Sequence, residues 1–309
     1  MHADVAIPKA KPRLPTQGAW LFAGPGTLLL FVFLCLPFLM AFVFSFTDQR
    51  LVTNEELGTE FVGLRNYVRL FDDDSFFAAL KNNFMFVSIA APLQSAFALL
   101  LAVLVNQALP GSKIFRTIYF MPVATTMAVV AVVWSLLYNP DAGVINRFVG
   151  FVSFGQIGPQ DWLRDPALVM HAVIVLSIWQ GVGFQMLVFL AGLQSIPEDL
   201  YEAASLEGAS PWTQFRYITL PLLKNTTIFV LVTTTIYAFQ LFTQVQIIAS
   251  SGTAAPIDSF RTMVMLMVNE GFKNGKIGYA SALAVVFFVI VLTLSLLQRV
   301  LIKEERAVA

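Results

Sequence analysis

The sequence predicts an all-α integral membrane protein with six transmembrane helices. Of its 309 residues, 57% are hydrophobic and only 12% are charged, which is about half the charged share of an ordinary soluble protein. The charges are also confined, because six windows without Asp, Glu, Lys or Arg each run for at least 22 residues. A helix needs ~20 apolar residues to cross the hydrocarbon core of a bilayer. Each window can therefore hold one membrane-spanning helix.

The six expected spans lie near residues 20–46, 83–105, 118–138, 167–193, 226–250 and 277–301. The first span follows Lys9, Lys11 and Arg13, as a signal peptide would, but its roughly 27 apolar residues exceed the ~7–15 residues of a signal core. We therefore expect an uncleaved first span. Residues 1–17 and 306–309 are expected to be short tails, and residues 18–305 are expected to form one transmembrane domain.

Basic residues indicate the orientation, because short loops rich in Lys and Arg stay in the cytoplasm. Such residues predominate in the N-terminal tail, in the connector with Lys113 and Arg116, and after span six at Lys303 and Arg306. Loops 47–82 and 139–166 carry more acids than bases. The pattern predicts that both termini are cytoplasmic, and that the connector between spans four and five is cytoplasmic too.

The loop before span two has its own helical pattern. We expect Asp74 or Ser75 to cap the helix of span two. The run of Asp72, Asp73 and Asp74 is interpreted as a solvated helix start, since adjacent helical residues do not face one ion. One apolar face is predicted to consist of Phe61, Leu64, Tyr67, Val68 and Phe71.

The chemistry of an enzyme is missing from the chain. There is one cysteine and there are two histidines, no Walker A pattern, and no catalytic or metal-binding motif. The net charge of zero gives no support to a nucleic-acid partner. No expected span has a charged residue in its interior, and His171 is interpreted as an interfacial residue rather than a proton relay. We expect no enzyme activity, metal or cofactor in this chain.

The connector after span four, "SIPEDLYEAASLEGASPWTQFRYITLPLL" at 195–223, predicts two helices. Ser195 and Glu198 form a predicted capping box, with Pro197 in the first turn. Gly208 suits the left-handed position that ends a helix. Ser210 then predicts a second start, with Pro211 at the first helical position.

These two helices leave two interpretations open. Pro221 is expected to bend the entry into span five. The first helix has a small apolar face with alanines, and Glu202 and Glu207 offer carboxylates to a basic partner. The connector is either an amphipathic segment lying on the membrane or a docking element for another protein.

The spacing within the connector resembles a known family signature. It reads E-A-A, three residues, G, nine residues, I-x-L-P, and it resembles the signature of permease subunits of binding-protein-dependent ABC importers. The residues that carry the match are Glu202, Ala203, Ala204, Gly208, Ile218, Leu220 and Pro221. The resemblance implies that the loop at 195–223 couples the permease to a cytoplasmic ATPase.

The same resemblance implies a fold, a location and a set of partners. The fold is that of a type I ABC importer permease, in the bacterial cytoplasmic (inner) membrane. The partners are a second permease subunit, forming a hetero-dimer, an ATPase dimer that binds ATP and Mg, an extracytoplasmic solute-binding protein, and membrane lipid. No cofactor is implied for this chain itself.

Three further stretches resemble carbohydrate-uptake permeases of the maltose and glycerol-3-phosphate type. They are "FVGLRNYVRLF" (61–71), "RTIYFMPVATTMAVVAVVWSLLYNPDAGVIN" (116–146) and "LQSIPEDLYEAASLEGAS" (193–210). The segment "SSGTAAP" (250–256) departs from the Gly-Gly-Pro turn that relatives often have there. The resemblance implies a sugar importer; the alternative is the same machinery for a non-sugar solute such as a polyol or a glycerophosphate compound.

Spans four and five are where the family resemblance implies substrate contacts. Sugars bind through aromatic rings and uncharged hydrogen-bonding groups, whereas polar residues in spans also serve helix packing. Thr233, Tyr237, Gln240 and Gln244 fall on one helical face. The expected substrate path consists of Gln180, Gly181, Phe184, Thr234, Tyr237 and Gln240. A membrane assembly subunit without a substrate path and a channel are the rival functions.

Overall fold

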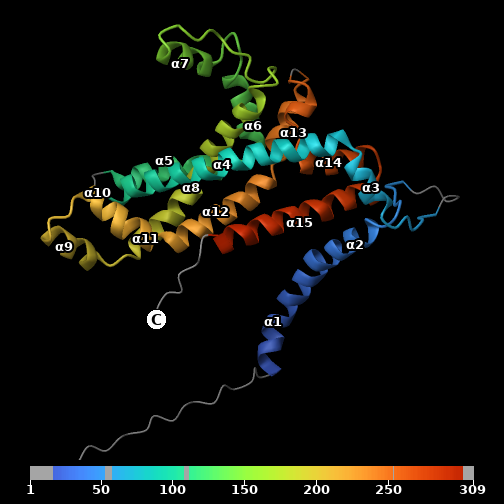
Figure 1. The fold of residues 1–309 in the computed structure, drawn as a ribbon, viewed down its shortest axis with the longest axis horizontal. Coiled ribbons are helices and arrows are strands. Elements are labelled where there is room, and N and C mark those ends of the chain that lie inside the picture. The colour runs from blue at the N-terminus through green and yellow to red at the C-terminus, as the bar shows by residue number, and fades with distance from the viewer. Residues whose placement is uncertain (1–16, 53–57, 108–110, 253, 302–309) are drawn as a thin grey trace, which may run out of the picture.

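The computed structural model describes residues 17–52, 58–107, 111–252 and 254–301, and it is helical throughout these ranges apart from connecting turns and loops. In Figure 1, helices α4 (Asp74–Asn106), α12 (Lys224–Phe239) and α15 (Ile277–Leu301) run along the longest axis of the molecule. Helix α3 (Arg65–Phe71) lies at one end of that axis, and α9 (Glu198–Leu206) and α10 (Pro211–Gln214) lie at the other. The expected tails, residues 1–17 and 306–309, lie almost wholly outside the described residues.

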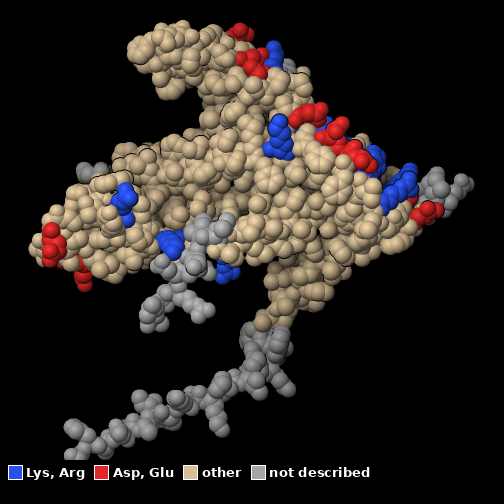
Figure 2. All heavy atoms as spheres, in the orientation of Figure 1, with Lys and Arg blue, Asp and Glu red and all other residues tan. Residues whose placement is uncertain are grey.

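Within these described ranges, five apolar helices are each long enough to cross a membrane. They are Ala23–Phe44, within α1 (Gln17–Leu30), a π-helical turn (Phe31–Cys35) and α2 (Leu36–Phe44); α4 (Asp74–Asn106); α8 (Val169–Gln194); Lys224–Ser250, formed by α12 (Lys224–Phe239) and α13 (Thr243–Ser250); and α15 (Ile277–Leu301). Figure 2 shows that charged side chains gather toward the ends of the molecule and on the α7 arm, while a broad surface between them carries none. That distribution suits a protein surrounded by hydrocarbon.

The window predicted as a single third span, 118–138, is instead two helices. α5 (Ser112–Ala124) and α6 (Met127–Leu137) meet at an angle of 99°. Pro122 removes one helical hydrogen bond near the end of α5, and Thr125 and Thr126 adopt extended backbone. Helix α5 packs on α8, whereas α6 packs on α13. The predicted third span is therefore a broken one, whose two halves cover different neighbours.

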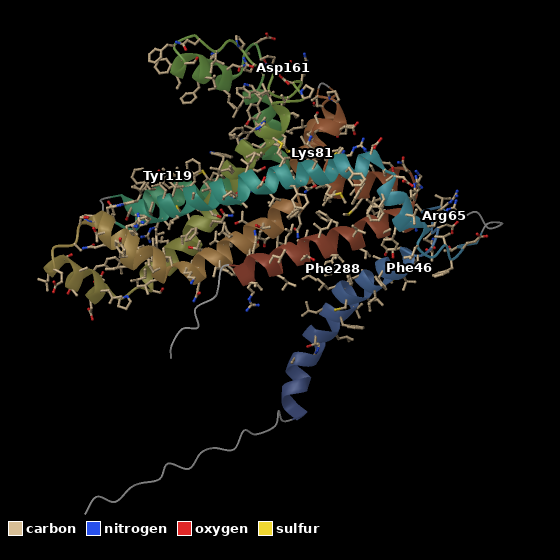
Figure 3. The ribbon with its side chains drawn as sticks, in the orientation of Figure 1. Phe46, Arg65, Lys81, Tyr119, Asp161 and Phe288 are labelled. Carbon is tan, nitrogen blue, oxygen red and sulfur yellow. The ribbon has the colours of Figure 1, made fainter. Side chains whose placement is uncertain are left out.

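The centre of the bundle is the contact between α4 and α8. Small residues form the buried face of α4, among them Ala90, Ala98 and Ala102, and such residues allow helices in a membrane to approach closely. The glycine Gly183 of α8 plays the same part toward α5, since a Cβ there would collide with the carbonyl oxygen of Tyr119. Phe38 of α2 packs against Phe288 of α15 with ring centroids 4.9 Å apart. Figure 3 shows where Phe288 lies on α15, next to α2.

Span five is interrupted in its middle, between Phe239 and Thr243. A break in a span frees backbone groups that hydrocarbon cannot satisfy. The buried amide of Asn83 on α4 donates to the Phe239 carbonyl (3.1 Å), and its oxygen accepts from the backbone N–H of Met263 (2.8 Å). Thr262 Oγ1 donates to the Leu241 carbonyl (2.8 Å). Residues outside span five therefore satisfy the backbone at its break.

The loop before α4 differs from its prediction in two respects. The cap of α4 is Asp73, whose carboxylate accepts from the N–H of Ser75, so the prediction of Asp74 or Ser75 as cap was wrong. The short helix α3 (Arg65–Phe71) buries Asn66 and Leu70. Of the residues predicted to form one apolar face, Tyr67 is half-buried and the others are exposed: Phe61, Leu64, Val68 and Phe71. Helix α3 is turned this way because the buried Asn66 amide donates to the carbonyls of Ser45 and Thr47.

The remaining helices are short and lie between spans. They are α7 (Val144–Val152), α9 (Glu198–Leu206), α10 (Pro211–Gln214), a π-helical turn (Phe215–Thr219), α11 (Leu220–Leu222), a 3₁₀ turn (Ile257–Ser259), α14 (Met263–Val268) and a π-helical turn (Asn269–Lys273). In the loop that departs from the family pattern, the N–H of Ala255 donates to the Leu163 carbonyl (2.8 Å), which ties this loop to the one before α8. His171 is exposed at the start of α8, with Nδ1 2.9 Å from the Ala167 carbonyl.

Candidate functional site

A cavity of about 470 Å³ lies between α4, α8 and the broken span five. No charged side chain of the described residues lines it. Its lining consists of Phe86, Gln94, Val123, Met127, Ser177, Gln180, Gly181, Phe184, Gln185, Thr234, Tyr237, Ala238, Gln240, Leu241, Phe242, Thr243 and Gln244. Five glutamines and two exposed aromatic rings belong to this uncharged surface, which combines hydrogen-bonding amides with apolar groups.

All six residues predicted for the substrate path line this one cavity: Gln180, Gly181, Phe184, Thr234, Tyr237 and Gln240. The first three share a face of α8, and the others approach from α12 and the break that follows it. Thr233, expected on the same helical face as Tyr237, does not line the cavity, and its hydroxyl donates to the Phe229 carbonyl. The structure brings the six together, and their contact with a solute stays a prediction.

One hydrogen-bonded pair fastens α8 to α12 in the cavity wall. The amide nitrogen of Gln185 donates to the hydroxyl of Thr234 (2.6 Å), and that hydroxyl donates to the Val230 carbonyl (2.6 Å). The hydroxyl proton of Thr234 is thus already used within its own helix. The other amide atom, Gln185 Oε1, is buried and has no partner among the described residues. A buried acceptor without a donor costs about 1–3 kcal/mol, so a hydroxyl group that reaches Gln185 Oε1 would bind favourably.

A second pair joins α13 to α8. Gln244 Nε2 donates to Ser177 Oγ (3.0 Å), which donates to the Val173 carbonyl (2.7 Å). In contrast, the side-chain amides of Gln94, Gln180 and Gln240 make no hydrogen bond within the described part of the chain. These three amides remain available as donors and acceptors to a solute.

Gly181 provides the space for one of these amides. A Cβ on Gly181 would collide with Nε2 of Gln94, the far end of that side chain. The cavity is open on one side, because Tyr237 is 68% exposed and Phe184 is 50% exposed. Sequence reasoning missed Gln94, Ser177 and Gln185. The available signal was the presence of amide and hydroxyl groups in otherwise apolar spans, where unpaired polar groups are costly.

The connector between spans four and five forms a second candidate site, a helical hairpin of residues 195–223. Helix α9 ends as predicted at Gly208, which has φ of +78°. The N–H of Gly208 donates to the Ser205 carbonyl (3.0 Å), and that of Ala209 donates to the Ala204 carbonyl (2.9 Å). This pair of bonds is the Schellman arrangement, which needs a left-handed residue at the glycine position.

The predicted capping box at the start of α9 was wrong. Ser195 still belongs to the end of α8, and its hydroxyl donates back to the Gly192 carbonyl (2.7 Å). Pro197 precedes the first helical residue, Glu198, and no side chain caps the helix. The Ser195 side chain turns back to the preceding turn, and the residue before α9 is Pro197, two positions further on, so Ser195 does not occupy the capping position.

The second helical start of the hairpin is confirmed. Ser210 Oγ accepts from the N–H of Thr213 (3.3 Å), and Pro211 is the first residue of α10. Pro221 lies in α11, and the chain leaves helical geometry at Leu223 before α12 begins. The helix is therefore interrupted two residues after Pro221, and the bend predicted at this entry stays a prediction.

Three side-chain bonds hold the two arms of the hairpin together. Tyr201 and Thr219 share a hydrogen bond (2.9 Å), and Gln214 Nε2 donates to Ser205 Oγ (2.9 Å) and to the Ala209 carbonyl (3.3 Å). Of the seven signature residues, Ala204 and Ile218 are half-buried, and the rest are exposed: Glu202, Ala203, Gly208, Leu220 and Pro221. At the tip of α9, Leu206 is 90% exposed. The hairpin is a braced element with an exposed surface.

Comparisons with known proteins agree with this geometry. Residues 94–306 match the family described as "Binding-protein-dependent transport system inner membrane component". A probable ABC transporter permease of Bacillus subtilis, YurN, is 36% identical over 77% of this chain and 81% of its own length. The lactose transport permease LacF of Rhizobium radiobacter is 32% identical over 93% of this chain and 94% of its own length. The sn-glycerol-3-phosphate permease UgpA of Yersinia enterocolitica is 33% identical over 78% of this chain and 80% of its own length.

Solved structures share the fold. A bacterial ABC transporter for import of the acidic polysaccharide alginate superimposes with a TM-score of 0.78, at 21% identity, over 95% of this chain and 98% of that chain. An alginate transporter in complex with a periplasmic protein carrying an alginate pentasaccharide gives a TM-score of 0.76, at 22% identity, over 92% of this chain and 95% of that chain. Subunits of this kind are membrane transport components rather than enzymes. The chain is a multi-pass membrane protein that belongs to the family of binding-protein-dependent transport system inner membrane components, the permease subunits of ABC importers.

Proposed function

We propose that this chain forms one half of the translocation path of an ATP-driven sugar importer, and that the Gln-rich cavity is where the solute passes. The uncharged lining with its hydrogen-bonding amides is the observation that carries the proposal. Its free amides at Gln94, Gln180 and Gln240 can exchange hydrogen bonds with hydroxyl groups, and the exposed ring of Tyr237 offers a stacking surface. A second permease would close the open side of the cavity.

The lining favours a neutral sugar over the alternative, a glycerophosphate compound. A phosphate in this cavity would meet no cationic side chain of the described residues, and an unpaired charge away from water is costly. One relative is named for lactose and another for sn-glycerol-3-phosphate, so relatives of both kinds exist. The chemistry of the cavity supports the sugar.

The hairpin at 195–223 is proposed to receive the signal of ATP binding from a cytoplasmic ATPase dimer. Its exposed signature residues and its internal hydrogen bonds support this role. A rigid hairpin moves as a unit when a partner displaces it, so the movement reaches the spans. The proposed assembly contains this chain, a different second permease, two ATPase subunits and an extracytoplasmic solute-binding protein. It lies in the bacterial inner membrane, with the hairpin and both termini in the cytoplasm. ATP and solute then bias the same inward-to-outward equilibrium.

The test uses the complete complex reconstituted in liposomes with its binding protein. We expect ATP-dependent uptake of a neutral mono- or oligosaccharide, and stimulation of ATP hydrolysis by the sugar-loaded binding protein. Glycerophosphodiesters, offered in the same assay, should not compete with the sugar, and polyols, which have hydroxyl groups but no ring to stack on Tyr237, should compete only weakly. Uptake of a glycerophosphodiester in preference to every neutral sugar would overturn the sugar assignment, and uptake without ATP would overturn the importer mechanism.

A further inference from the structure

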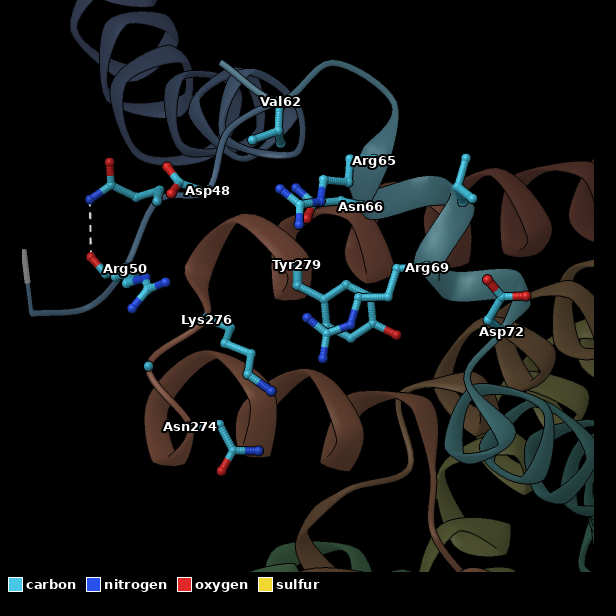
Figure 4. A pocket seen from close by; sticks show the side chains of 13 residues that line it. Asp48, Arg50, Val62, Arg65, Asn66, Arg69, Asp72, Asn274, Lys276 and Tyr279 are labelled. Atoms are coloured by element: carbon cyan, nitrogen blue, oxygen red, sulfur yellow. Dashed lines mark hydrogen bonds between the residues drawn. The ribbon is translucent and has the colours of Figure 1, made fainter. Parts of the chain in front are cut away.

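A second cavity, of about 660 Å³, lies at the end of the molecule opposite the hairpin, and it is rich in cations. Four basic side chains line it, Arg50, Arg65, Arg69 and Lys276, against two acids, Asp48 and Asp72. Figure 4 shows that these residues come from three segments around one hollow: the loop after α2, helix α3, and the start of α15. The translocation path and the ATPase contact leave this cavity without a role.

Backbone hydrogen bonds fix the walls of this outer cavity. The N–H of Leu51 donates to the Gly275 carbonyl (2.9 Å), and the N–H of Gly278 donates to the Gln49 carbonyl (2.9 Å). A Cβ at Gly278 would collide with the Thr47 carbonyl oxygen, so the two segments are in close contact. The loop is further held by the buried amide of Asn66 through the carbonyls of Ser45 and Thr47. The cavity is therefore formed before any ligand arrives.

Two of the four cations have internal partners. Lys276 Nζ is 3.1 Å from Glu270 Oε2. The guanidinium of Arg69 lies over the ring of Tyr279, 4.5 Å from its centroid, and the Tyr279 hydroxyl donates to Asp73. One oxygen of the acid Asp48 is already occupied by the N–H of Glu60.

The other two cations, Arg50 and Arg65, are exposed, and their side chains make no hydrogen bond or ion pair within the described ranges. Arginine presents planar donors that suit phosphate oxygens. An excess of unpaired arginines in a preformed hollow indicates a site for an anion that is not part of this chain.

The surroundings of the hollow indicate which anion. Beside it, α3 exposes Leu64, Val68 and Phe71, which are 62–72% exposed, and Val68 also lines the cavity. The adjoining end of α2 exposes Phe42 and Val43. A cationic hollow bordered by apolar side chains matches a phospholipid, which presents an anionic headgroup and apolar acyl chains together.

We propose that this outer cavity binds the phosphate of an anionic phospholipid in the leaflet facing away from the hairpin. Arg50 and Arg65 hold the headgroup, Arg69 and Lys276 line the floor, and the acyl chains lie along the apolar surface of α2 and α3. The lipid ties the loop after α2 to α3 and to the start of α15. The site is separate from the sugar cavity, so it stands whether or not the solute assignment holds.

The test measures lipid binding to the complete detergent-purified complex by native mass spectrometry and by thermal shift. The probes are dioleoyl phosphatidylglycerol, dioleoyl phosphatidylcholine and inorganic phosphate. We expect phosphatidylglycerol adducts and a raised unfolding temperature, with weaker effects of phosphatidylcholine. The double variant Arg50→Gln/Arg65→Gln should bind phosphatidylglycerol with roughly thirtyfold lower affinity, and the charge-keeping Arg50→Lys/Arg65→Lys should retain most of it.

The matched control is Lys81→Gln, which removes an exposed cation of α4 that lies outside the cavity and apart from Arg65 in Figure 3. It should leave lipid binding unchanged. Equal loss in Lys81→Gln and in the double variant would mean that net charge alone attracts the lipid, and would overturn the site. An equal thermal shift with inorganic phosphate would identify a free-anion site instead. Loss of binding-protein-stimulated ATP hydrolysis without loss of lipid would assign the cavity to the binding protein.

Discussion

The side chains of Gln185 and Thr234 are joined by a 2.6 Å hydrogen bond that ties α8 to α12 across 49 residues of sequence. The bond lies in the wall of the Gln-rich cavity and occupies the hydroxyl that sequence reasoning assigned to the solute. Thr234 therefore both lines the cavity and holds α8 against α12. The unpaired Gln185 Oε1 is the atom of this pair that can serve an incoming hydroxyl group.

Gln185→Leu is expected to raise the KM for transport about tenfold, since one hydrogen bond to a buried group contributes about 1–2 kcal/mol. The measurement is ATP-driven sugar uptake by the reconstituted complex. Gln246→Leu is the control, because Gln246 lies on α13 but outside the cavity. The role of Gln185 is contradicted if both variants show the KM of the original protein.

Gly181 and Gly183 give a matched pair of glycine substitutions. In Gly181→Ala, the new Cβ meets the mobile end of Gln94, so the protein should fold while the altered cavity weakens transport. In Gly183→Ala, the Cβ meets the backbone of Tyr119 and Phe120, which cannot withdraw without separating α5 from α8. We expect a normal yield of monodisperse complex for Gly181→Ala and a strongly reduced yield for Gly183→Ala. Similar yields for the two would show that α5 and α8 adjust freely.

Gly208→Val should uncouple ATP hydrolysis from transport. No atom lies within 4 Å of a Cβ at Gly208, so the cost is conformational, about 1–2 kcal/mol for a left-handed residue with a side chain. Gly208→Asn should be milder, because asparagine tolerates this conformation. Gly252→Val is the control: φ is +70°, the space is equally open, and the residue lies in the loop between spans five and six. If Gly252→Val uncouples transport as strongly, the effect is not specific to the hairpin.

The bond between Tyr201 and Thr219 is predicted to brace the hairpin against the ATPase. Tyr201→Phe and Thr219→Val should each lower the amount of sugar carried per ATP hydrolysed, and the double variant should resemble either single one. Non-additivity of this kind identifies a direct interaction between two residues. Fully additive losses would mean that the two side chains act separately, and an unchanged transport ratio in all three would exclude the bracing role.

Much of the membrane layout follows from the chain itself. A residue must be apolar wherever it meets hydrocarbon, so the uncharged windows locate the spans with little reference to the rest of the protein. Turn chemistry is equally local, and Gly208, Ser210 and Pro211 behave as the sequence predicts. Ser195 does not, because it ends α8 and α9 starts only after Pro197, two residues further on.

The site depends on contacts that no local pattern contains. The sequence by itself determined the apolar spans, the uncharged polar residues of spans four and five, and the two successive helices of the connector. Only the tertiary structure decided that span three bends by 99°, that span five opens at Gln240, and that Gln94 of span two completes the cavity. The physical reason is that a helix can break inside a membrane only where distant groups satisfy its freed backbone, and Asn83, 156 residues from Phe239, does so here.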